Sequence, residues 1–403
     1  MQHKIYLDNN ATTALHAKVI ERFYQLLQIF GNASSMHSFG RAAKTELDSA
    51  RAKIAELISA SSPDEIIFTS GGTESDNLAV IGVAEQLRSK GNHIITSAIE
   101  HPAVMSTCNY LMKRGYEITY LPVDHTGLIN PKDLEKALTP NTILVSIMLA
   151  NNEIGTVQPI TELSAITKKH KVLFHTDAVQ AMGKIPVNVQ TLGVDLLSLS
   201  GHKFHGPKGV GVLYVRKGLK LAPQMHGGKQ EQGMRSGTYN VPGIASMALA
   251  LSLAVDEIKS ETTRQTMLRE KLFKGLEKNI PEIQRNGHAE KCLPNTLNVT
   301  FKYIEGESML LRLDHDGIAV STGSACASGS LDPSHVLLAL GLPHELAHGS
   351  IRFSLSRETK EADIEYTIEK VAEVVKTLRA MSPLYNSLTP SSSPSPGGEG
   401  AGR

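Results

Sequence analysis

The sequence is poor in cysteine, and its charges nearly cancel. The cysteines are Cys108, Cys292 and Cys326, and no two of them have the CxxC spacing of thiolate metal sites or redox pairs. So few thiols, odd in number, argue against a disulfide framework. Lysine and arginine number 41 and aspartate and glutamate 40, for a net charge of +1. Because proteins that bind nucleic acid or anionic membranes usually carry a basic excess, neither is expected as the main partner.

Long apolar runs are also lacking. No stretch reaches the roughly 20 consecutive apolar residues of a membrane span. Residues 1–13, MQHKIYLDNNATT, do not follow the pattern of a signal peptide, so we expect a cytoplasmic protein. A chain of 403 residues is too long for one hydrophobic core, and we therefore expect two domains.

Short apolar runs alternate with helical patterns in the first part of the chain. Helical periodicity is plain at 41–58, and similar patterns run near 76–89, 160–169 and 244–258. The runs that are typical of buried strands are 65–70, 93–100, 141–150, 171–178 and 195–200. Alternation of this kind indicates an α/β fold, in which a parallel sheet lies between layers of helices. We place this large domain at residues 15–255.

The pattern changes after about residue 262. Residues 293–304 and 350–358 are typical of strands, and charged helical stretches lie at 262–278 and 360–380. We predict a smaller α+β domain that combines residues 1–14 with 256–382. Residues 387–403 are rich in serine, proline and glycine, a composition that predicts a disordered tail.

Each strand-like run of the large domain ends in a polar cluster. In open α/β sheets the ligand lies at the carboxyl ends of the strands, so we expect these clusters to form one site. In chain order the clusters are GGTESDN from Gly71, His101-Pro102, Asn151-Asn152-Glu153, Asp177 to Gln180, and Gly201-His202-Lys203.

Three of these clusters together describe a cofactor site. Gly71-Gly72-Thr73 lies between a strand and a helix, where backbone N–H groups can bind a phosphate, although a plain strand-to-helix turn would look the same. Asp177 ends an apolar strand, where a carboxylate needs a cationic partner or hydrogen bonds. Lys203, which alone would be taken for a solvated charge, completes the set required for pyridoxal phosphate. In such sites a lysine forms a Schiff base and a carboxylate pairs with the pyridinium nitrogen.

The chain resembles the cysteine desulfurases of the NifS/IscS family, which are fold-type I pyridoxal phosphate enzymes, from about residue 5 to 380. The stretches that carry the resemblance are YLDNNATT, GNASSMHSFGR, FTSGGTESDN, AIEHPAV, NNEIGTVQPI, HTDAVQ, SLSGHKFHGPKGVG, RSGTYN, SACASGSLDPSHVL and IRFSLSRET. The resemblance implies a large domain with a mostly parallel seven-stranded sheet between helices, plus the smaller α+β domain.

The resemblance also implies a role for each matched position. Lys203 resembles the lysine that binds the cofactor covalently, Asp177 and Gln180 the contacts to the pyridine nitrogen and the ring hydroxyl, and His101 the stacked imidazole with an acid–base role. The implied phosphate contacts are Gly72, Thr73, Ser200 and His202, with Thr238 reaching the phosphate of the neighbouring subunit of a homodimer. Asn152 and Arg352 resemble the pair that holds the substrate carboxylate, a task that suits the planar fork of arginine.

Cys326 lies among small polar residues in STGSACASGS, residues 321–330. A buried cysteine is usually a small hydrophobe, a description that fits Cys108 but not Cys326. The resemblance implies that Cys326 takes the sulfur of L-cysteine as a persulfide and leaves L-alanine. The sulfur then passes to an acceptor protein for iron–sulfur cluster assembly, with tRNA thiolation as a further outlet. We predict a mobile loop at about 321–333, because the thiol has to reach both a buried substrate and a partner.

Several alternatives stay open at this point. A selenocysteine lyase, or another fold-type I enzyme such as an aminotransferase, would share the cofactor site, although Cys326 argues against an aminotransferase. A scaffold without catalysis would not need both Lys203 and Cys326. HELAH at 344–348 matches the HExxH motif of zinc proteases, but the surrounding glycine and proline leave room for about one helical turn, and we predict no metal site.

The sequence departs from the family pattern in three places. GGKQEQG at 227–233, with Lys229 and Gln232, stands where GGGQERG is frequent, and Tyr239 follows RSGT. Ser356 replaces the glycine of IRFSLGR. These departures concern the dimer-facing loop and the carboxylate end of the site, and they leave the expected cofactor contacts in place.

Overall fold

The computed structural model describes residues 4–322 and 332–386. Its largest sheet is built from β2 (Ile66–Thr69), β3 (His93–Ser97), β4 (Glu117–Leu121), β5 (Thr142–Ser146), β6 (Leu173–Asp177), β7 (Leu196–Ser200) and β8 (Gly211–Val215). The strand order is β2-β8-β7-β6-β5-β3-β4. All neighbouring strands are parallel except where β8 pairs with β2 and β7. The predicted α/β fold with a mostly parallel seven-stranded sheet is confirmed.

Helices cover both faces of this sheet. They are α1 (Ala17–Leu26), α2 (Ser38–Leu57), α3 (Gly72–Gln86), α4 (Pro102–Met112), α5 (Pro131–Ala137), α6 (Ile160–Lys169), α7 (Val189–Leu192) and α8 (Val241–Asn279). Successive side chains of a strand enter opposite layers: Ile67 packs with α3 and α4, whereas Ile66 and Phe68 pack with α2 and α8. Because both faces are covered, every residue of β2, β3, β5, β7 and β8 is buried.

The long helix α8 belongs to two hydrophobic cores. Its first part, including Ile244 and Leu251, packs beneath the seven-stranded sheet, and its last part, including Leu272 and Leu276, packs in the second core. The sequence pattern predicted two helices here, which is wrong, because the polar residues 259–262 include no glycine or proline to interrupt the backbone. The predicted domain boundary at 255 therefore falls inside a continuous helix.

Among the described residues, α8 is also the helix whose length and apolar composition would suffice to cross a membrane. Half of its apolar window is buried inside the protein, as expected for a core helix.

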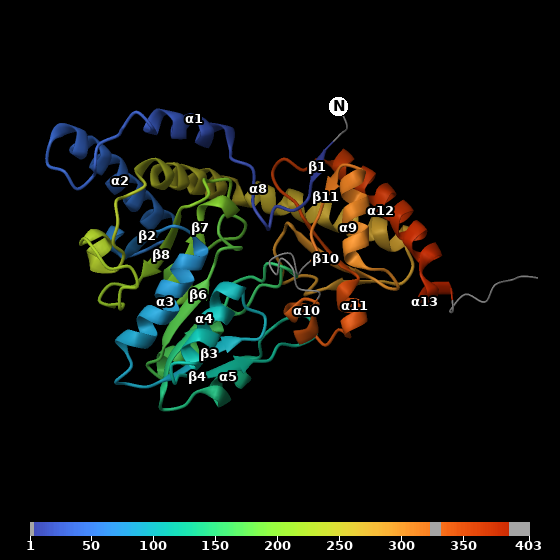
Figure 1. Cartoon of the computed structure of the whole chain (residues 1–403), viewed down its shortest axis with the longest axis horizontal. Coiled ribbons are helices and arrows are strands. Elements are labelled where there is room, and N and C mark those ends of the chain that lie inside the picture. Colours follow the sequence, from blue (N-terminus) through green and yellow to red (C-terminus); the bar gives the residue numbers. More distant parts are fainter. Residues whose placement is uncertain (1–3, 323–331, 387–403) are drawn as a thin grey trace, which may run out of the picture.

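The second core surrounds a three-stranded antiparallel sheet in the order β12-β10-β9. Its strands are β9 (Ile283–Asn286), β10 (Thr296–Phe301) and β12 (Ser350–Ser354). Helices α9 (Gly306–His315) and α12 (Glu361–Met381) pack on it, together with the short parallel pair β1 (Ile5–Tyr6) and β11 (Ile318–Ala319). Short helices α10 (His335–Ala339), α11 (His344–His348) and α13 (Pro383–Asn386) complete the described chain. The N-terminal segment thus runs from this second core into the first (Figure 1).

Candidate active site

The candidate site forms where segment 8–13 crosses the carboxyl ends of the strands of the large sheet. Lys203, in a short 3-10 helix that directly follows β7, donates from Nζ to the carbonyl oxygens of Asn10 at 2.5 Å and Ala11 at 2.9 Å. Thr13 holds the same crossing in place, because its backbone N–H donates to the carbonyl of His202 at 3.1 Å. The predicted amine therefore lies against the N-terminal segment.

Asp177, the last residue of β6, is a buried carboxylate that is only 6% exposed. Its Oδ1 accepts from the backbone N–H of Val179 at 2.8 Å. Burial raises the pKa of Asp177 to about 6, against the opposing effects of that hydrogen bond and of the Lys203 charge. In the described part of the chain no cationic side chain forms a salt bridge with it. Such a carboxylate would be stabilised by a cationic ring N–H.

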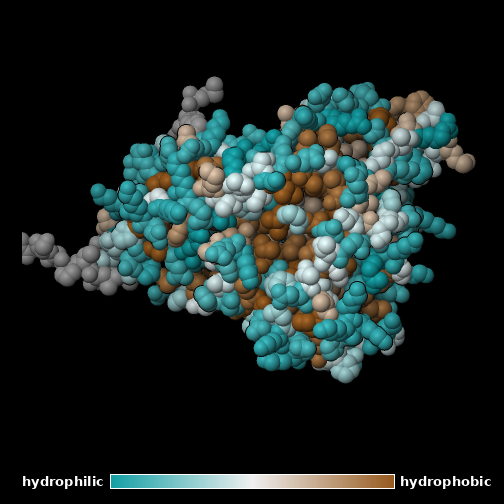
Figure 2. All heavy atoms as spheres, turned by 180° about the vertical axis from the view of Figure 1, so that it is seen from behind, coloured by the Kyte–Doolittle hydropathy of each residue, from teal (hydrophilic) through white to brown (hydrophobic). Residues whose placement is uncertain are grey.

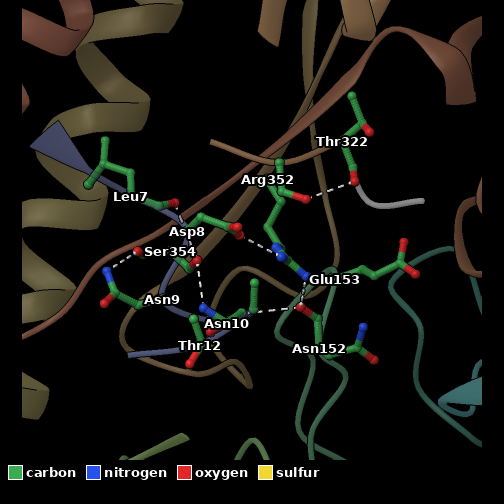
Figure 3. Close-up of polar contacts among 12 residues, drawn as sticks. Leu7, Asp8, Asn9, Asn10, Thr12, Asn152, Glu153, Thr322, Arg352 and Ser354 are labelled. Atoms are coloured by element: carbon green, nitrogen blue, oxygen red, sulfur yellow. Dashed lines mark hydrogen bonds and ion pairs between the residues drawn. The ribbon is translucent and has the colours of Figure 1, made fainter. Parts of the chain in front are cut away.

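Gln180 is joined to Lys203 through Asn10. The side-chain amide of Gln180 donates from Nε2 to the carbonyl oxygen of Asn10 at 2.9 Å, the same oxygen that accepts from Lys203. Its Oε1 accepts from Lys184 Nζ at 2.7 Å. The Asn10 side chain in turn donates to the carbonyl of Asn152 at 3.1 Å (Figure 3). Asn10 is therefore the residue around which the predicted site residues meet.

Arg352 reaches this group from β12 of the three-stranded sheet. Its guanidinium donates from Nη2 to Asp8 Oδ1 at 2.8 Å and from Nη1 to the carbonyl of Asn152 at 3.0 Å (Figure 3). The residue is 4% exposed, and its buried Nε has no hydrogen-bond partner among the described residues. A buried donor of this kind normally has an acceptor, and a substrate carboxylate would supply one.

His101 caps α4 from the loop after β3. Its Nδ1 accepts from the backbone N–H of Ala103 at 3.1 Å, which leaves Nε2 as the protonated nitrogen of the neutral ring. Burial, and then the charges of Lys203 and His335, lower the pKa of His101 to about 4. The ring is therefore neutral near pH 7, as is suited to packing on an aromatic cofactor.

The start of α3 has the close packing expected of a phosphate site. A Cβ on Gly72 would lie 2.7 Å from Cγ2 of Val179 and 3.6 Å from Cβ of Ser200, so only glycine fits between these neighbours. The first N–H groups of a helix have no intrahelical acceptor and are available to an anion. His202 contacts Thr12 Oγ1 through Nδ1 at 3.1 Å, and burial, ahead of nearby lysine charges, lowers its pKa to about 4.

Thr238 lies on the segment that precedes α8, apart from the group around Asn10. It is exposed, and in the described part of the chain it shares no hydrogen bond with the remaining predicted residues. Its segment is nevertheless anchored beside the first turn of α3, because Arg235 forms an ion pair with Glu74 at 2.8 Å. An exposed threonine at this place agrees with a contact to a second subunit, which remains a prediction.

Cys326 and the rest of segment 323–331 lie outside the described residues, and so does the predicted tail 387–403. The residues that flank the cysteine segment are described. Ser321 pairs with Arg352 through backbone hydrogen bonds of 3.2 and 2.7 Å. Ser334 donates to Glu153 Oε2 at 2.5 Å, next to Asn152. Both ends of the segment are therefore fastened beside the predicted substrate-binding pair.

Sequence reasoning missed a buried group of titratable side chains behind Asp177. Asp76 and His175 are buried, with Asp76 Oδ1 3.7 Å from His175 Nε2. Burial, followed by the Asp177 charge, raises the pKa of Asp76 well above its usual value, and burial raises that of Glu100 to about 8. Asn10 and Lys184 were missed as well. The only available signals were the conspicuous YLDNNATT motif around Asn10 and the polar residues inside α3.

The motif HELAH forms α11, which spans only five residues before β12 begins at Ser350. Within residues 4–322 and 332–386, no three histidine, cysteine, aspartate or glutamate side chains are grouped as a metal site.

The residues that depart from the family pattern serve local structure. Gln232 donates to the carbonyl of Asp64 at 2.7 Å, and the hydroxyl of Tyr239 accepts from the N–H of Glu231 at 3.2 Å. Ser356 Oγ accepts from the N–H of Glu358 at 3.2 Å. Lys229 lines an open groove beside α2.

The chain is similar over nearly its whole length to class-V aminotransferase family members. The model of the aminotransferase class-V family matches residues 5–367. The cysteine desulfurase IscS of Dictyoglomus turgidum is 55% identical over 384 residues, which covers 95% of this chain and 97% of that protein. The cysteine desulfurase IscS of Methanosarcina thermophila is 52% identical over 94% of both chains. Among solved structures, a NifS-like protein of 41% identity superposes with a TM-score of 0.88 over 93% of this chain and 100% of its own.

Proposed function

Because the chain belongs to the aminotransferase class-V family, we propose that it is a cysteine desulfurase that uses pyridoxal phosphate to remove sulfur from L-cysteine. The observation that carries this proposal is that Lys203 and Arg352 both bind segment 8–13, and that the Lys203 amine lies close enough to buried Asp177 for its charge to lower the pKa of that carboxylate. An amine, an unpaired buried carboxylate and a guanidinium with a spare donor are the groups that an amino acid and a pyridine cofactor require. The near-complete coverage by relatives named cysteine desulfurase supports the same activity.

The side chains fit pyridoxal phosphate in kind. Asp177 would pair with the ring nitrogen, Gln180 would donate to the ring hydroxyl, and His101 would pack on the ring. The phosphate would accept hydrogen bonds from the N–H groups at the start of α3, where the absence of a side chain on Gly72 leaves space for it. Ser200 and His202 would be further phosphate contacts. When bound, the cofactor supplies an electron sink that weakens the bonds around the α-carbon of an amino acid.

The protein's own residues position the substrate and move its protons. Arg352 would hold the carboxylate of L-cysteine with Nε and its neighbouring donors, and the Asn152 side chain would assist. Lys203 would accept the proton from the α-carbon, and the carbonyls of Asn10 and Ala11 keep its amine at that position. Neutral His101 would carry a proton to or from the leaving sulfur.

Cys326 would take the sulfur. Its thiolate attacks the substrate sulfur, so that a sulfur–sulfur bond forms and the Cβ–S bond breaks with its electron pair left on carbon. Protonation of that carbon yields L-alanine, and Cys326 is left as a persulfide. The hydrogen bonds of Ser321 to Arg352 and of Ser334 to Glu153 support this role. They hold the residues on either side of the cysteine segment next to the proposed substrate-binding residues.

We further propose that the protein works as a homodimer and passes sulfur to an acceptor protein such as an iron–sulfur scaffold. Several large apolar side chains between residues 15 and 39 are exposed, among them Tyr24 at 67%, Phe30 at 78% and Met36 at 90%. Figure 2, which views the molecule from behind relative to Figure 1, shows apolar side chains gathered near the middle of that face. Exposed apolar surface of this extent is typical of a face that another subunit covers.

The activity is tested by incubating the purified protein with pyridoxal phosphate and L-cysteine and measuring L-alanine and sulfide. Wild-type protein should form both, and Cys326→Ser should bind cofactor and cysteine without forming alanine. Cys292→Ser, a half-buried cysteine outside the site, is the matched control and should keep the activity. Alanine formation by Cys326→Ser at the wild-type rate would contradict the role of Cys326. Turnover of L-selenocysteine but not of L-cysteine would point to a selenocysteine lyase instead.

A further inference from the structure

Lys184 is a buried amine that none of the proposed chemical steps uses. It lies seven residues after the end of β6 and four residues after Gln180. Its Nζ donates to Gln180 Oε1 at 2.7 Å and to Asn10 Oδ1 at 3.2 Å. Gln180 Nε2 donates to the carbonyl oxygen of Asn10 at 2.9 Å. The oxygen of the Gln180 amide therefore faces a donor, the Lys184 amine, and its nitrogen faces an acceptor, the Asn10 carbonyl.

We propose that Lys184 is a positioning residue that fixes which end of the Gln180 amide faces the cofactor ring. The inference rests on the proposed function in one respect, namely that pyridoxal phosphate is the group that Gln180 faces.

The two contacts of the amide allow only one orientation. If the amide were turned over, its oxygen would face the carbonyl oxygen of Asn10 with no hydrogen between them, and the hydrogen bond from Lys184 Nζ to Oε1 would be lost. In the observed orientation one N–H of Gln180 is used by Asn10, and the second is the donor that a ring hydroxyl oxygen requires. Removing the Lys184 amine leaves Oε1 without this donor and weakens the preference for that orientation.

The surroundings of Lys184 distinguish this contact from an ordinary surface pair. The stem of Lys184 is partly exposed along a small cavity that Lys203 also lines, but its amine is buried. Burial, and then the charges of Lys203 and Arg352, lower the pKa of Lys184 well below its usual value. No carboxylate forms a salt bridge with it in the described chain. A buried amine is costly, and here its hydrogen bonds are to two amide oxygens of the site.

Asn10 depends less on Lys184 than Gln180 does. The Asn10 side chain donates to the Asn152 carbonyl and to Thr296 Oγ1, and its Oδ1 also accepts from Asn295 at 3.0 Å. These contacts hold Asn10 in place when the Lys184 amine is removed. The effect of a Lys184 substitution should therefore be transmitted through Gln180.

The experiment is a double-mutant cycle on cofactor binding. Lys184→Met, Gln180→Ala and the double variant are prepared without cofactor, and pyridoxal phosphate is titrated into each while its absorption spectrum is recorded. Lys184→Met should weaken cofactor affinity about tenfold and shift the absorption maximum, because a hydrogen bond to a charged or buried group is worth that much. In the Gln180→Ala background the same substitution should change neither quantity, since its target is gone.

Controls separate this role from a general loss of structure. Lys271→Met removes a half-exposed lysine away from the site and should leave cofactor binding unchanged. Lys184→Arg keeps a donor and should recover part of the affinity, and unfolding midpoints of the cofactor-free variants report their stability. Equal effects of Lys184→Met in both Gln180 backgrounds would overturn the inference, as would an unchanged spectrum and affinity. Wild-type protein that binds no pyridoxal phosphate would overturn the proposed function together with it, so the two failures are distinguishable.

Discussion

Asp177 and Arg352 are two buried groups of opposite charge in the candidate site, and within the described residues only Arg352 forms a salt bridge. Arg352 comes from the three-stranded sheet and forms an ion pair with Asp8 at 2.8 Å. Asp177 comes from the seven-stranded sheet and accepts from the N–H of Val179, with no salt bridge in the described chain. Burial raises the pKa of Asp177 to about 6.

The difference teaches how the two halves of the site would receive their ligands. Burial destabilises the ionised carboxylate of Asp177. Pairing it with a cationic ring nitrogen would therefore contribute a large favourable free energy to cofactor binding. The substrate side already has its guanidinium held in place by Asp8 and by the Asn152 carbonyl. An incoming carboxylate finds a prepared donor there and shares it with Asp8.

The largest expected effect follows from removing the unpaired charge. Asp177→Asn keeps an oxygen for the Val179 N–H but cannot pair with a cationic ring nitrogen. Loss of one partner of a buried ion pair costs about 3–5 kcal/mol, so alanine formation should fall by about a thousandfold. Asp133→Asn, a carboxylate in an exposed pair, is the control and should be neutral. If Asp177→Asn kept activity within tenfold of wild type, Asp177 would not be the partner of a cationic ring nitrogen.

Whereas Asp177→Asn should lower activity, it should raise the free energy of unfolding of the cofactor-free protein at neutral pH. The folded-state pKa of Asp177, about 6, lies above its usual 3.8, so its contribution to stability is full at low pH and is lost as pH rises through 6. Relative to wild type, cofactor-free Asp177→Asn should gain up to about 3 kcal/mol of unfolding free energy between pH 4 and 7. Denaturant unfolding at several pH values measures this gain, and parallel curves for the two proteins would count against it.

The paired charge should give the smallest effect. Arg352→Lys keeps the positive charge but loses the planar fork, so the KM for L-cysteine should rise about tenfold with little change in kcat. Steady-state kinetics measure both quantities. Arg269→Lys alters a buried ion pair with Glu270 away from the site and should lower stability without changing KM. A fall in kcat as large as that of Asp177→Asn would mean that Arg352 does more than hold the carboxylate.

The strands and their polar ends could be predicted because each depends on neighbouring residues. The runs at 65–70 and 171–178 contain β2 and β6, and the clusters that follow them, with Gly72 and Asp177, reach the candidate site. The other two strands of the large sheet were expected only from the resemblance. The edge strand β4 is mostly half-exposed and has no buried run, and β8, although fully buried, was not recognised in the glycine-rich stretch that precedes it.

Asn10 and Lys184 could not have been identified from local sequence. An asparagine in a loop has many ordinary roles, and a lysine four residues after a glutamine is usually solvated. Their importance comes from partners such as Thr296, which lies 286 residues from Asn10 in the chain. No periodicity or spacing reports a contact of that kind.

The sequence by itself determined the alternation of apolar strands with helices, the choice of Lys203, Asp177 and Cys326 as candidate reactive groups, and the order in which the motifs occur. Only the tertiary structure decided which charges are paired. Arg352 forms an ion pair with Asp8 across 344 residues of sequence, whereas within the described residues Asp177 forms no salt bridge, although the nearby Lys203 charge lowers its pKa. The physical reason is that an ion pair and a pKa depend on burial and on the distance between charges, and both arise only when the folded chain brings distant segments together.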